Sequence, residues 1–200
     1  DPSIEVKSIG LTGKDDMGAF LRQKIGEYGI DVSLIQETDQ AMTSFSDVMS
    51  VKETGERTFF HNRGACRLFD ETNLHLEELD AELVLLGYGG LLDAFNAGDE
   101  EYGTSLARAF HDLKEKGIVT AMDVTSTNDA AEMQRLVIPS LKYVDYLIVN
   151  EIEGGMIAGI EPRDENGSLI PGVLERISRK IMNYGVQKCC VLHAPEMGAA

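Results

Sequence analysis

The sequence predicts an α/β protein, with a mainly parallel sheet flanked by helices and a small antiparallel segment near its start. Short apolar runs alternate with segments of helical periodicity after Leu74, and a stretch rich in Thr, Ser, Val and Phe precedes them at residues 38–62. Alternating strands and helices of this length form parallel sheets with right-handed crossovers. The chain has 200 residues, which suffices for one domain with a proper core.

The sequence up to Leu74 predicts a strand, a helix and a hairpin. Residues 6–11 are an apolar strand candidate, and Asp15 or Asp16 can cap the helix that follows and ends at Gly29. Strand-forming residues at 38–51 and 58–62 flank a Glu-Thr-Gly-Glu turn, which predicts an antiparallel hairpin exposed on one face. The apolar stripe that the helix should bury consists of Met17, Phe20, Leu21, Ile25 and Tyr28.

The rest of the chain predicts alternating strands and helices. Residues 83–86 are a continuous apolar run, as expected for a parallel strand buried on both faces. A short helix over residues 129–137 should be closed by Pro139. Further strands are expected at residues 118–124, 144–149 and 188–192, and the other helices should end at Gly117 and Gly185.

The composition argues against several classes of function. The formal net charge is −16, from 34 acidic and 18 basic residues, which opposes binding to nucleic acid or to an anionic membrane. We expect neither a transmembrane helix nor a signal peptide. The three cysteines do not make a disulfide framework, so the cytoplasm is the expected compartment. Because the chain begins with Asp1 and stops just after a predicted strand, we expect it to be a piece of a longer protein.

Residues that could bind a ligand follow the predicted strands, because ligands of open α/β sheets bind outside the carboxyl ends of the strands. The glycine-rich turn at residues 10–18 could take an anion or a sugar hydroxyl, or it could be a plain tight turn. It is neither a Walker A nor a dinucleotide-binding motif. Two later endings are Asp-Val-Thr-Ser-Thr-Asn at residues 123–128 and His-Ala-Pro-Glu-Met-Gly at residues 193–198. A lone histidine such as His193 is more often a surface residue than a catalyst.

A further ending is Asn-Glu-Ile-Glu at residues 150–153, at the start of a helix. An amide and a carboxylate at a helix N-terminus suit a hydrated Mg²⁺ ion beside phosphate, since this ion needs only one or two protein carboxylates. The alternative is a capping box, in which Asn150 caps the helix and Glu153 closes the box. Residues 164–167 resemble a calcium loop with a misplaced glycine, and we expect a surface turn there.

The ordered series of motifs resembles the PfkB, or ribokinase-like, family of carbohydrate and nucleoside kinases over essentially the whole chain. Residues 8–18, Ser-Ile-Gly-Leu-Thr-Gly-Lys-Asp-Asp-Met-Gly, look like the "iG.vG.D..G" segment of that family. Residues 149–153, Val-Asn-Glu-Ile-Glu, match its N-x-x-E motif. Matches to the "gvd" segment and to the two strands of a small β lid are found at residues 29–31, Thr43, residues 55–57 and residues 64–65.

The resemblance implies a ribokinase-like fold, in which residues 38–66 are a β lid inserted in a partial domain that spans residues 1–200. It implies phosphoryl transfer from ATP, with Mg²⁺, to a hydroxymethyl group of a sugar or nucleoside. In relatives the catalytic Asp lies in a Gly-Ala-Gly-Asp segment, which we expect beyond residue 200. This chain should therefore contain no catalytic residue and show no turnover alone. The alternative is a non-catalytic sugar- or nucleotide-binding relative.

The resemblance also implies roles for individual residues. Asn150 and Glu153 would organise the phosphates, with Glu153 at the metal ion, and Gly198 would lie on the nucleotide side. A homodimer through the lid is expected, because a small sheet with an apolar face and open edges invites pairing. That dimer would cover Phe45, Val48, Phe59 and Phe60, and the sugar pocket would be bounded by Gly13, Asp15, Thr43, Arg57 and Arg63.

Overall fold

The computed structural model describes residues 4–125 and 127–200, so Ser126 of the Asp-Val-Thr-Ser-Thr-Asn ending lies outside the described residues. The chain divides into two compact units. The first contains the described part of Asp1–Glu77 together with Leu91–Ala94, and the second contains Glu78–Gly90 and Phe95–Ala200.

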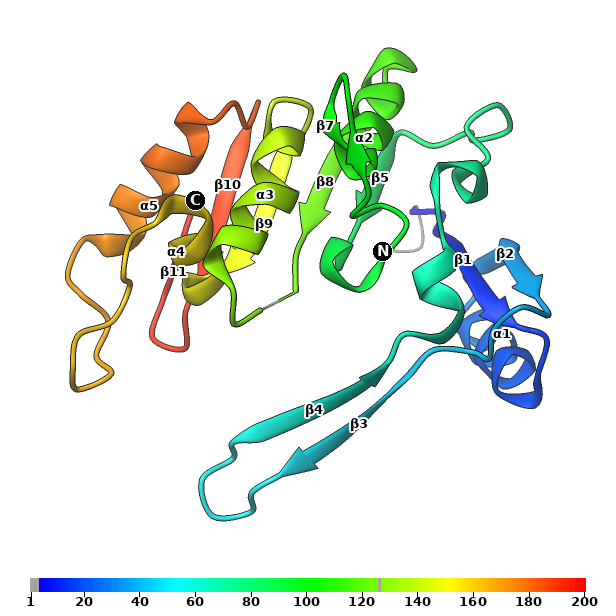
Figure 1. Cartoon of the computed structure of the whole chain (residues 1–200), viewed down its shortest axis with the longest axis horizontal. Coiled ribbons are helices and arrows are strands. Elements are labelled where there is room, and N and C mark those ends of the chain that lie inside the picture. The colour runs from blue at the N-terminus through cyan, green and yellow to red at the C-terminus, as the bar shows by residue number, and fades with distance from the viewer. Residues whose placement is uncertain (1–3, 126) are drawn as a thin grey trace. The chain divides into compact units, whose positions relative to one another are not determined.

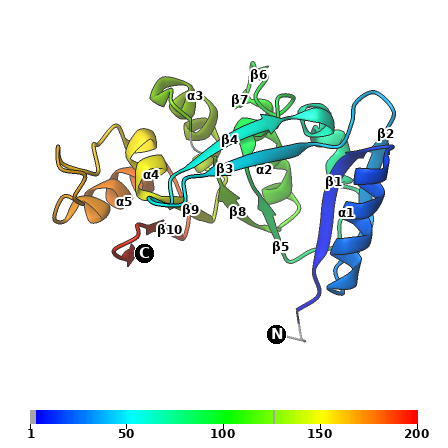
Figure 2. The same cartoon turned by 90° about the horizontal axis from the view of Figure 1, so that it is seen from below.

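The first unit is built from a parallel strand pair, a helix and a hairpin (Figure 1). β1 (Lys7–Gly13) pairs in parallel with β2 (Asp31–Thr38), and Figure 2 shows that α1 (Asp16–Glu27) lies beside this pair. The antiparallel hairpin predicted from the sequence is confirmed, and Gly55 in its turn has a φ of +75°, which favours glycine. The prediction that the hairpin is exposed on one face is wrong, because every residue of both strands is exposed. It consists of β3 (Phe45–Ser50) and β4 (Arg57–Asn62), and the short helices η1 (Gly64–Leu68) and η2 (Glu71–Leu74) follow it.

The second unit contains a five-stranded sheet in the order β11-β10-β9-β8-β5. The four parallel strands are β5 (Leu83–Leu86), β8 (Val119–Asp123), β9 (Tyr146–Asn150) and β10 (Cys189–His193). The last strand, β11 (Gly198–Ala199), is antiparallel to β10. This mainly parallel sheet with helices between its strands confirms the predicted fold class.

The helices of the second unit bury their apolar residues against the sheet and against one another. Helix α2 buries Leu106, Phe110 and Leu113, and helix α5 buries Ile177 and Ile181. The helices are α2 (Ser105–Glu115), α3 (Ala130–Leu141), α4 (Glu151–Ala158) and α5 (Val173–Asn183). Between β5 and α2 lie the short elements η3 (Gly89–Leu91), β6 (Gly98–Asp99) and β7 (Gly103–Thr104).

Two further predictions of burial are wrong. In α1, the residue that the structure buries is Gly18, where the helix comes close to Gly13 and Thr43. The predicted stripe is exposed at Met17, Phe20, Leu21 and Tyr28, with Tyr28 84% exposed. Strand β5 buries only one of its two faces, between which its side chains alternate: Val84 and Leu86 are buried, whereas Leu83 and Leu85 are exposed.

The predicted end of the third helix is also wrong. Helix α3 continues through Pro139 to Leu141. Proline removes one backbone hydrogen bond from a helix interior. Ser140 and Leu141 are fully buried, however, so tertiary packing holds the last turn in helical conformation.

Candidate functional site

In the first unit, the structure brings three of the predicted substrate residues into one hydrogen-bonded junction. Asp15 caps α1 by accepting from the Gly18 N–H at 2.8 Å. The same carboxylate accepts from the Thr43 backbone N–H at 2.8 Å and from the Thr43 hydroxyl at 2.6 Å. Thr43 Oγ1 in turn accepts from the Gly13 N–H at 3.0 Å. The junction therefore ties the β1–α1 turn to the residues that lead into β3.

The glycines of the turn are required by this close approach. A Cβ atom at Gly13 would overlap the backbone of Met42 and Thr43, and one at Gly18 would overlap the Gly13 carbonyl oxygen.

The hydrogen bond from the Thr43 hydroxyl is the main cause that lowers the pKa of Asp15 below its ordinary value. Asp15 is therefore held as a carboxylate whose oxygen atoms bind neighbouring parts of the chain.

The two predicted arginines of the hairpin are not brought together. Arg57 begins β4, close to the turn, and its guanidinium lies 5.4 Å from the centre of the Phe59 ring. Arg63 follows the other end of β4 and forms an ion pair with Asp93. At about 3.3 Å per strand residue their backbones are about 20 Å apart, so only Arg63 lies near the junction at the base of the hairpin.

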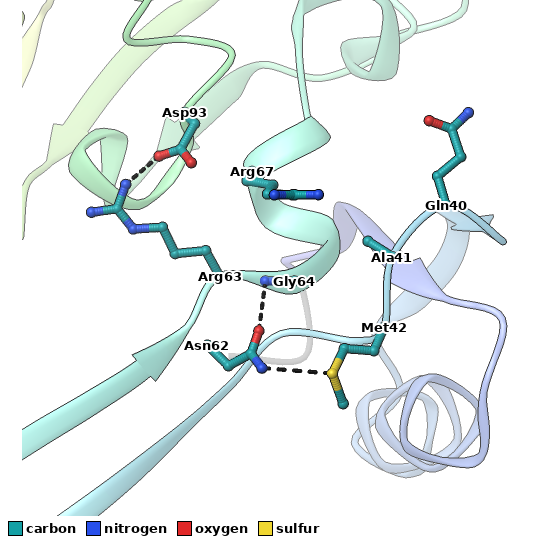
Figure 3. Close-up of a pocket in the computed structure, with 8 residues that line it drawn as sticks. All are labelled: Gln40, Ala41, Met42, Asn62, Arg63, Gly64, Arg67 and Asp93. Carbon is teal, nitrogen blue, oxygen red and sulfur yellow. Dashed lines mark hydrogen bonds and ion pairs between the residues drawn. The ribbon is translucent and has the colours of Figure 1, made fainter.

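A hollow of about 370 Å³ opens at the base of the hairpin (Figure 3). Figure 3 shows Arg63 reaching Asp93, while Arg67 extends from η1 toward the side where Gln40 lies. Arg67 was not among the residues predicted from the sequence, although its spacing of four residues from Arg63 is typical of two side chains on one face of a helical turn. The lining residues are Gln40, Ala41, Met42, Asn62, Arg63, Gly64, Arg67 and Asp93.

In the second unit, the carboxyl ends of three neighbouring strands carry Asp123, Asn150 and His193. The strand register places Asp123 opposite Ile148 on β9, and Asn150 opposite His193 on β10. Burial raises the pKa of the Asp123 carboxyl, although the Val124 N–H, at 2.8 Å, and the nearby His193 partly offset this rise. This edge is where open α/β sheets bind their ligands.

Asn150 and Glu153 form a complete capping box at the start of α4. Asn150 Oδ1 accepts from the Glu153 N–H at 2.8 Å, and Glu153 Oε2 accepts from the Asn150 N–H at 3.0 Å. The cap fixes both side chains at the end of β9. A carboxylate has about four lone-pair positions, so a capping role and a role near a metal ion are compatible.

Helix α4 begins close to the sheet because two glycines follow Glu153. A Cβ atom at Gly154 would overlap Leu192 of β10 and lie 3.1 Å from Ile177 of α5. A Cβ atom at Gly155 would lie 2.7 Å from the Ile160 carbonyl oxygen. The close packing sets the position of the capping box relative to β10.

Gly198 begins β11, which a tight turn connects to β10. The Ala194 N–H donates to the Met197 carbonyl at 2.8 Å, and Gly198 then pairs with His193. Gly198 is exposed. The predicted nucleotide-side residues Asn150 and Gly198 are therefore both neighbours of His193, one on each side of β10.

The residues at this edge suit a hydrated Mg²⁺ ion better than a metal ion that is bound by three or more protein side chains. No group of three or more His, Cys, Asp or Glu side chains that could hold a metal ion occurs in the described part of the chain. Glu153 supplies a buried carboxylate at a helix N-terminus, next to the amide side chain of Asn150. Mg²⁺ takes one or two carboxylates and otherwise keeps water or binds phosphate oxygens, so this donor set suits it.

Comparison with known proteins identifies the family. The sequence matches the family described as pfkB family carbohydrate kinase over residues 3–195. The chain belongs to this family.

Solved structures of kinases share the fold at low sequence identity. One is 2-dehydro-3-deoxygluconokinase from Thermotoga maritima, with a TM-score of 0.76 and 16% identity over 95% of this chain and 58% of that one. Another is ribokinase from Giardia lamblia, with a TM-score of 0.69 and 16% identity over 93% of this chain and 52% of that one. A third is a putative ribokinase II from E. coli in complex with ATP and Mg²⁺, with a TM-score of 0.71 and 16% identity over 98% of this chain and 62% of that one.

These matches establish a ribokinase-like fold, and the chain spans between about half and two thirds of the length of each of these kinases. No helix in the described ranges, 4–125 and 127–200, is long and apolar enough to cross a membrane.

Proposed function

We propose that the protein containing this chain transfers the γ-phosphoryl group of ATP to a hydroxymethyl group of a sugar. The observation that carries this proposal is the Asn150–Glu153 pair, fixed by reciprocal hydrogen bonds at the carboxyl edge of the sheet. Family membership supports a carbohydrate as the acceptor. One fructokinase with this fold has been solved with fructose, ADP and calcium ion bound.

On the nucleotide side, Asn150 and Glu153 would orient the phosphates, and Gly198 would line the same edge. A bound Mg²⁺ ion would offset the charge of the phosphate oxygens, which is a large part of what phosphoryl transfer requires. The carboxylate of Glu153 would hold the water shell of that ion. The N-terminus of α4 would add its partial positive charge. The general base is expected from a segment beyond residue 200.

On the sugar side, we propose that residues 38–66 act as a lid and that Gly13, Asp15, Thr43, Arg57 and Arg63 bound the pocket. The Asp15–Thr43 junction supports a positioning role, because it fixes the chain that enters the hairpin. Arg63 would act from the hollow at the hairpin base. Arg57 would act only if the hairpin turn closes over the sugar.

The exposed apolar residues of the hairpin support a homodimer through the lid. Phe45, Val48, Phe59 and Phe60 are all exposed in the single chain. We also propose the cytoplasm as the compartment, since all three cysteines are free thiols and a reducing compartment keeps them so. Nucleic acid and membrane surfaces are not among the proposed partners, because the net charge is −16.

The test uses the purified full-length protein. A coupled assay would measure ADP release with MgATP and a panel of sugars and nucleosides, and calorimetry would measure binding of Mg·ADP. We expect turnover with at least one sugar and Mg²⁺-dependent nucleotide binding. Binding without turnover on any acceptor would favour the non-catalytic alternative, and absence of Mg·ADP binding would refute the kinase proposal.

A further inference from the structure

Arg163, which lies in the segment between α4 and α5, uses its whole hydrogen-bonding capacity on three separate parts of the second unit. Its Nε and Nη2 groups donate to Glu151 Oε1, at 3.0 and 2.5 Å. Its Nη1 and Nη2 groups donate to Glu196 Oε1 and Oε2, at 2.8 and 3.1 Å. Nη1 also donates to the Gly167 carbonyl at 2.8 Å. A guanidinium has five N–H donors, and these five bonds use all of them.

The partners of Arg163 flank the proposed nucleotide site. Glu151 is the first residue of α4, directly after Asn150. Glu196 lies in the turn between β10 and β11, two residues before Gly198. Arg163 therefore bridges the helix that carries the Asn150–Glu153 pair and the turn that leads to Gly198.

The third partner of Arg163, the Gly167 carbonyl, fixes the guanidinium in place. Residues 164–168 form a turn in which Asp164 Oδ1 accepts from the N–H groups of Asn166 and Ser168, each at 2.9 Å, and which contains the surface turn predicted at residues 164–167. This turn holds the Gly167 carbonyl against Arg163, and Arg163 itself pairs with Leu169 in an isolated bridge. The guanidinium is thus anchored from its own loop.

The electrostatics of the cluster favour the same role. Glu151 is only 6% exposed, and Arg163 offsets its charge. The hydrogen bond from Arg163 is the main cause that lowers the pKa of Glu196. Without the guanidinium, a buried carboxylate would stand uncompensated beside the edge where the anionic phosphates are proposed to bind.

We propose that Arg163 is a positioning residue for the nucleotide: it holds the first turn of α4 and the β10–β11 turn at a fixed separation and offsets their carboxylates. This inference rests on the proposed function of the Asn150–Glu153 edge. Residues that orient a metal-binding group through hydrogen bonds typically change metal affinity or activity by about 10–100-fold when they are replaced. Replacement of Arg163 should weaken the binding of Mg·nucleotide and leave the binding of the sugar unchanged.

The experiment compares variants of the full-length kinase by calorimetry with Mg·ADP and by steady-state kinetics. Arg163→Met keeps the aliphatic part of the side chain. It should weaken the binding of Mg·ADP and raise the KM for MgATP, each by about tenfold or more, with the KM for sugar unchanged. Arg163→Lys keeps the charge but cannot make the planar five-bond bridge, so it should recover only part of this loss. The matched control is Arg179→Met, which removes an exposed pair with Glu175 on α5 and should behave as the wild type.

Glu196→Gln leaves the contact between Arg163 and the first turn of α4 in place and loosens only the β10–β11 turn. It should therefore weaken the binding of Mg·ADP even if Arg163→Met fails to fold. Wild-type affinity for Mg·ADP in folded Arg163→Met or in Glu196→Gln would overturn the inference, as would an equal change in the KM for sugar or full recovery by lysine. A wild-type protein that binds no Mg·ADP would instead overturn the proposed function on which the inference rests.

Discussion

Replacing Asp145 with alanine should destabilise the second unit without altering the proposed nucleotide site. The Asp145 side chain is 2% exposed and accepts from Lys114 Nζ at 2.8 and 3.0 Å. It also accepts from the Thr120 N–H at 3.0 Å, and Lys188 Nζ lies 3.6 Å away. Asp145 precedes β9, whereas Asn150 ends this strand, so the two residues lie at opposite edges of the sheet.

The loss of stability in Asp145→Ala depends on which partners of Asp145 remain buried without it. Removing one partner of a buried ion pair costs about 3–5 kcal/mol. Lys114 is 33% exposed and can turn to water, which favours the lower end of that range. The buried Thr120 N–H would lose its acceptor, at about 1–3 kcal/mol. We expect a total of about 4 kcal/mol, which corresponds to a fall in Tm of about 8–16 °C for a domain of 150–250 residues.

Thermal and urea unfolding of the full-length protein would measure this loss. Asp145→Asn keeps an oxygen acceptor for Thr120 and should lose less than Asp145→Ala. Glu175→Ala is the matched control, because it removes an exposed pair worth at most about 1 kcal/mol. A Tm for Asp145→Ala equal to that of the control would refute the reasoning, and so would a change in Mg·ADP affinity.

The loss should also depend on pH in a defined direction. Burial raises the pKa of Asp145, but the hydrogen bonds from Lys114 and Thr120 outweigh burial and hold the pKa below its ordinary value. A carboxyl with a lowered folded-state pKa contributes stability above its unfolded-state value of about 3.9, and this contribution is lost as pH falls through the folded-state value. The difference between wild type and Asp145→Ala should stay constant from about pH 6 to 8 and shrink below about pH 4. A difference that grows on acidification would contradict this account.

Three further predictions concern the site and the hairpin. Glu153→Gln should lower turnover and raise the Mg²⁺ requirement in kinetic titrations with little loss of Tm, because Gln can also close a capping box; unchanged Mg²⁺ dependence would exclude the metal role. Gly154→Ala should lower the free energy of unfolding by about 1–3 kcal/mol in urea titrations, because its Cβ would overlap Leu192, and a stabilised variant would show that α4 can move away. Phe60→Asp should make the full-length protein sediment as a monomer if the wild type forms the proposed lid dimer, and a wild-type protein that sediments as a concentration-independent monomer would rule out that dimer.

The alternation of strands and helices was enough to predict the fold class, but not every element, because the strand β2 and the short antiparallel strand β11 were not predicted. A local pattern also predicted the start of α4, because Asn150 and Glu153 are three residues apart and form a capping box. Apolar periodicity was less reliable for burial. It shows which residues a helix can bury, and Phe20 and Leu21 are exposed because the close approach of α1 to its neighbours occurs at Gly18.

The long-range parts of the candidate site could not be predicted from the sequence. Asp15 and Thr43 were each singled out, but their hydrogen bonds join positions 28 residues apart, which no local pattern encodes. Arg163 was not predicted, since its partners Glu151 and Glu196 are 12 and 33 residues away in the sequence. Such contacts depend on the crossover connections that bring strand ends together.

The strong acidity of the chain and a phosphate-binding edge are compatible because charge acts locally at short range. The net charge of −16 repels polyanions. At physiological ionic strength, salt screens this repulsion at separations beyond about 8–10 Å. At the edge itself, Arg163 offsets Glu151 and Glu196, and the N-terminus of α4 points its partial positive charge outward. In the proposed function, Glu153 should favour binding of a nucleotide that carries a Mg²⁺ ion over binding of one without it. The acidity would therefore act as a selectivity device: free ATP should bind more weakly than MgATP, and this difference should narrow in Glu153→Gln.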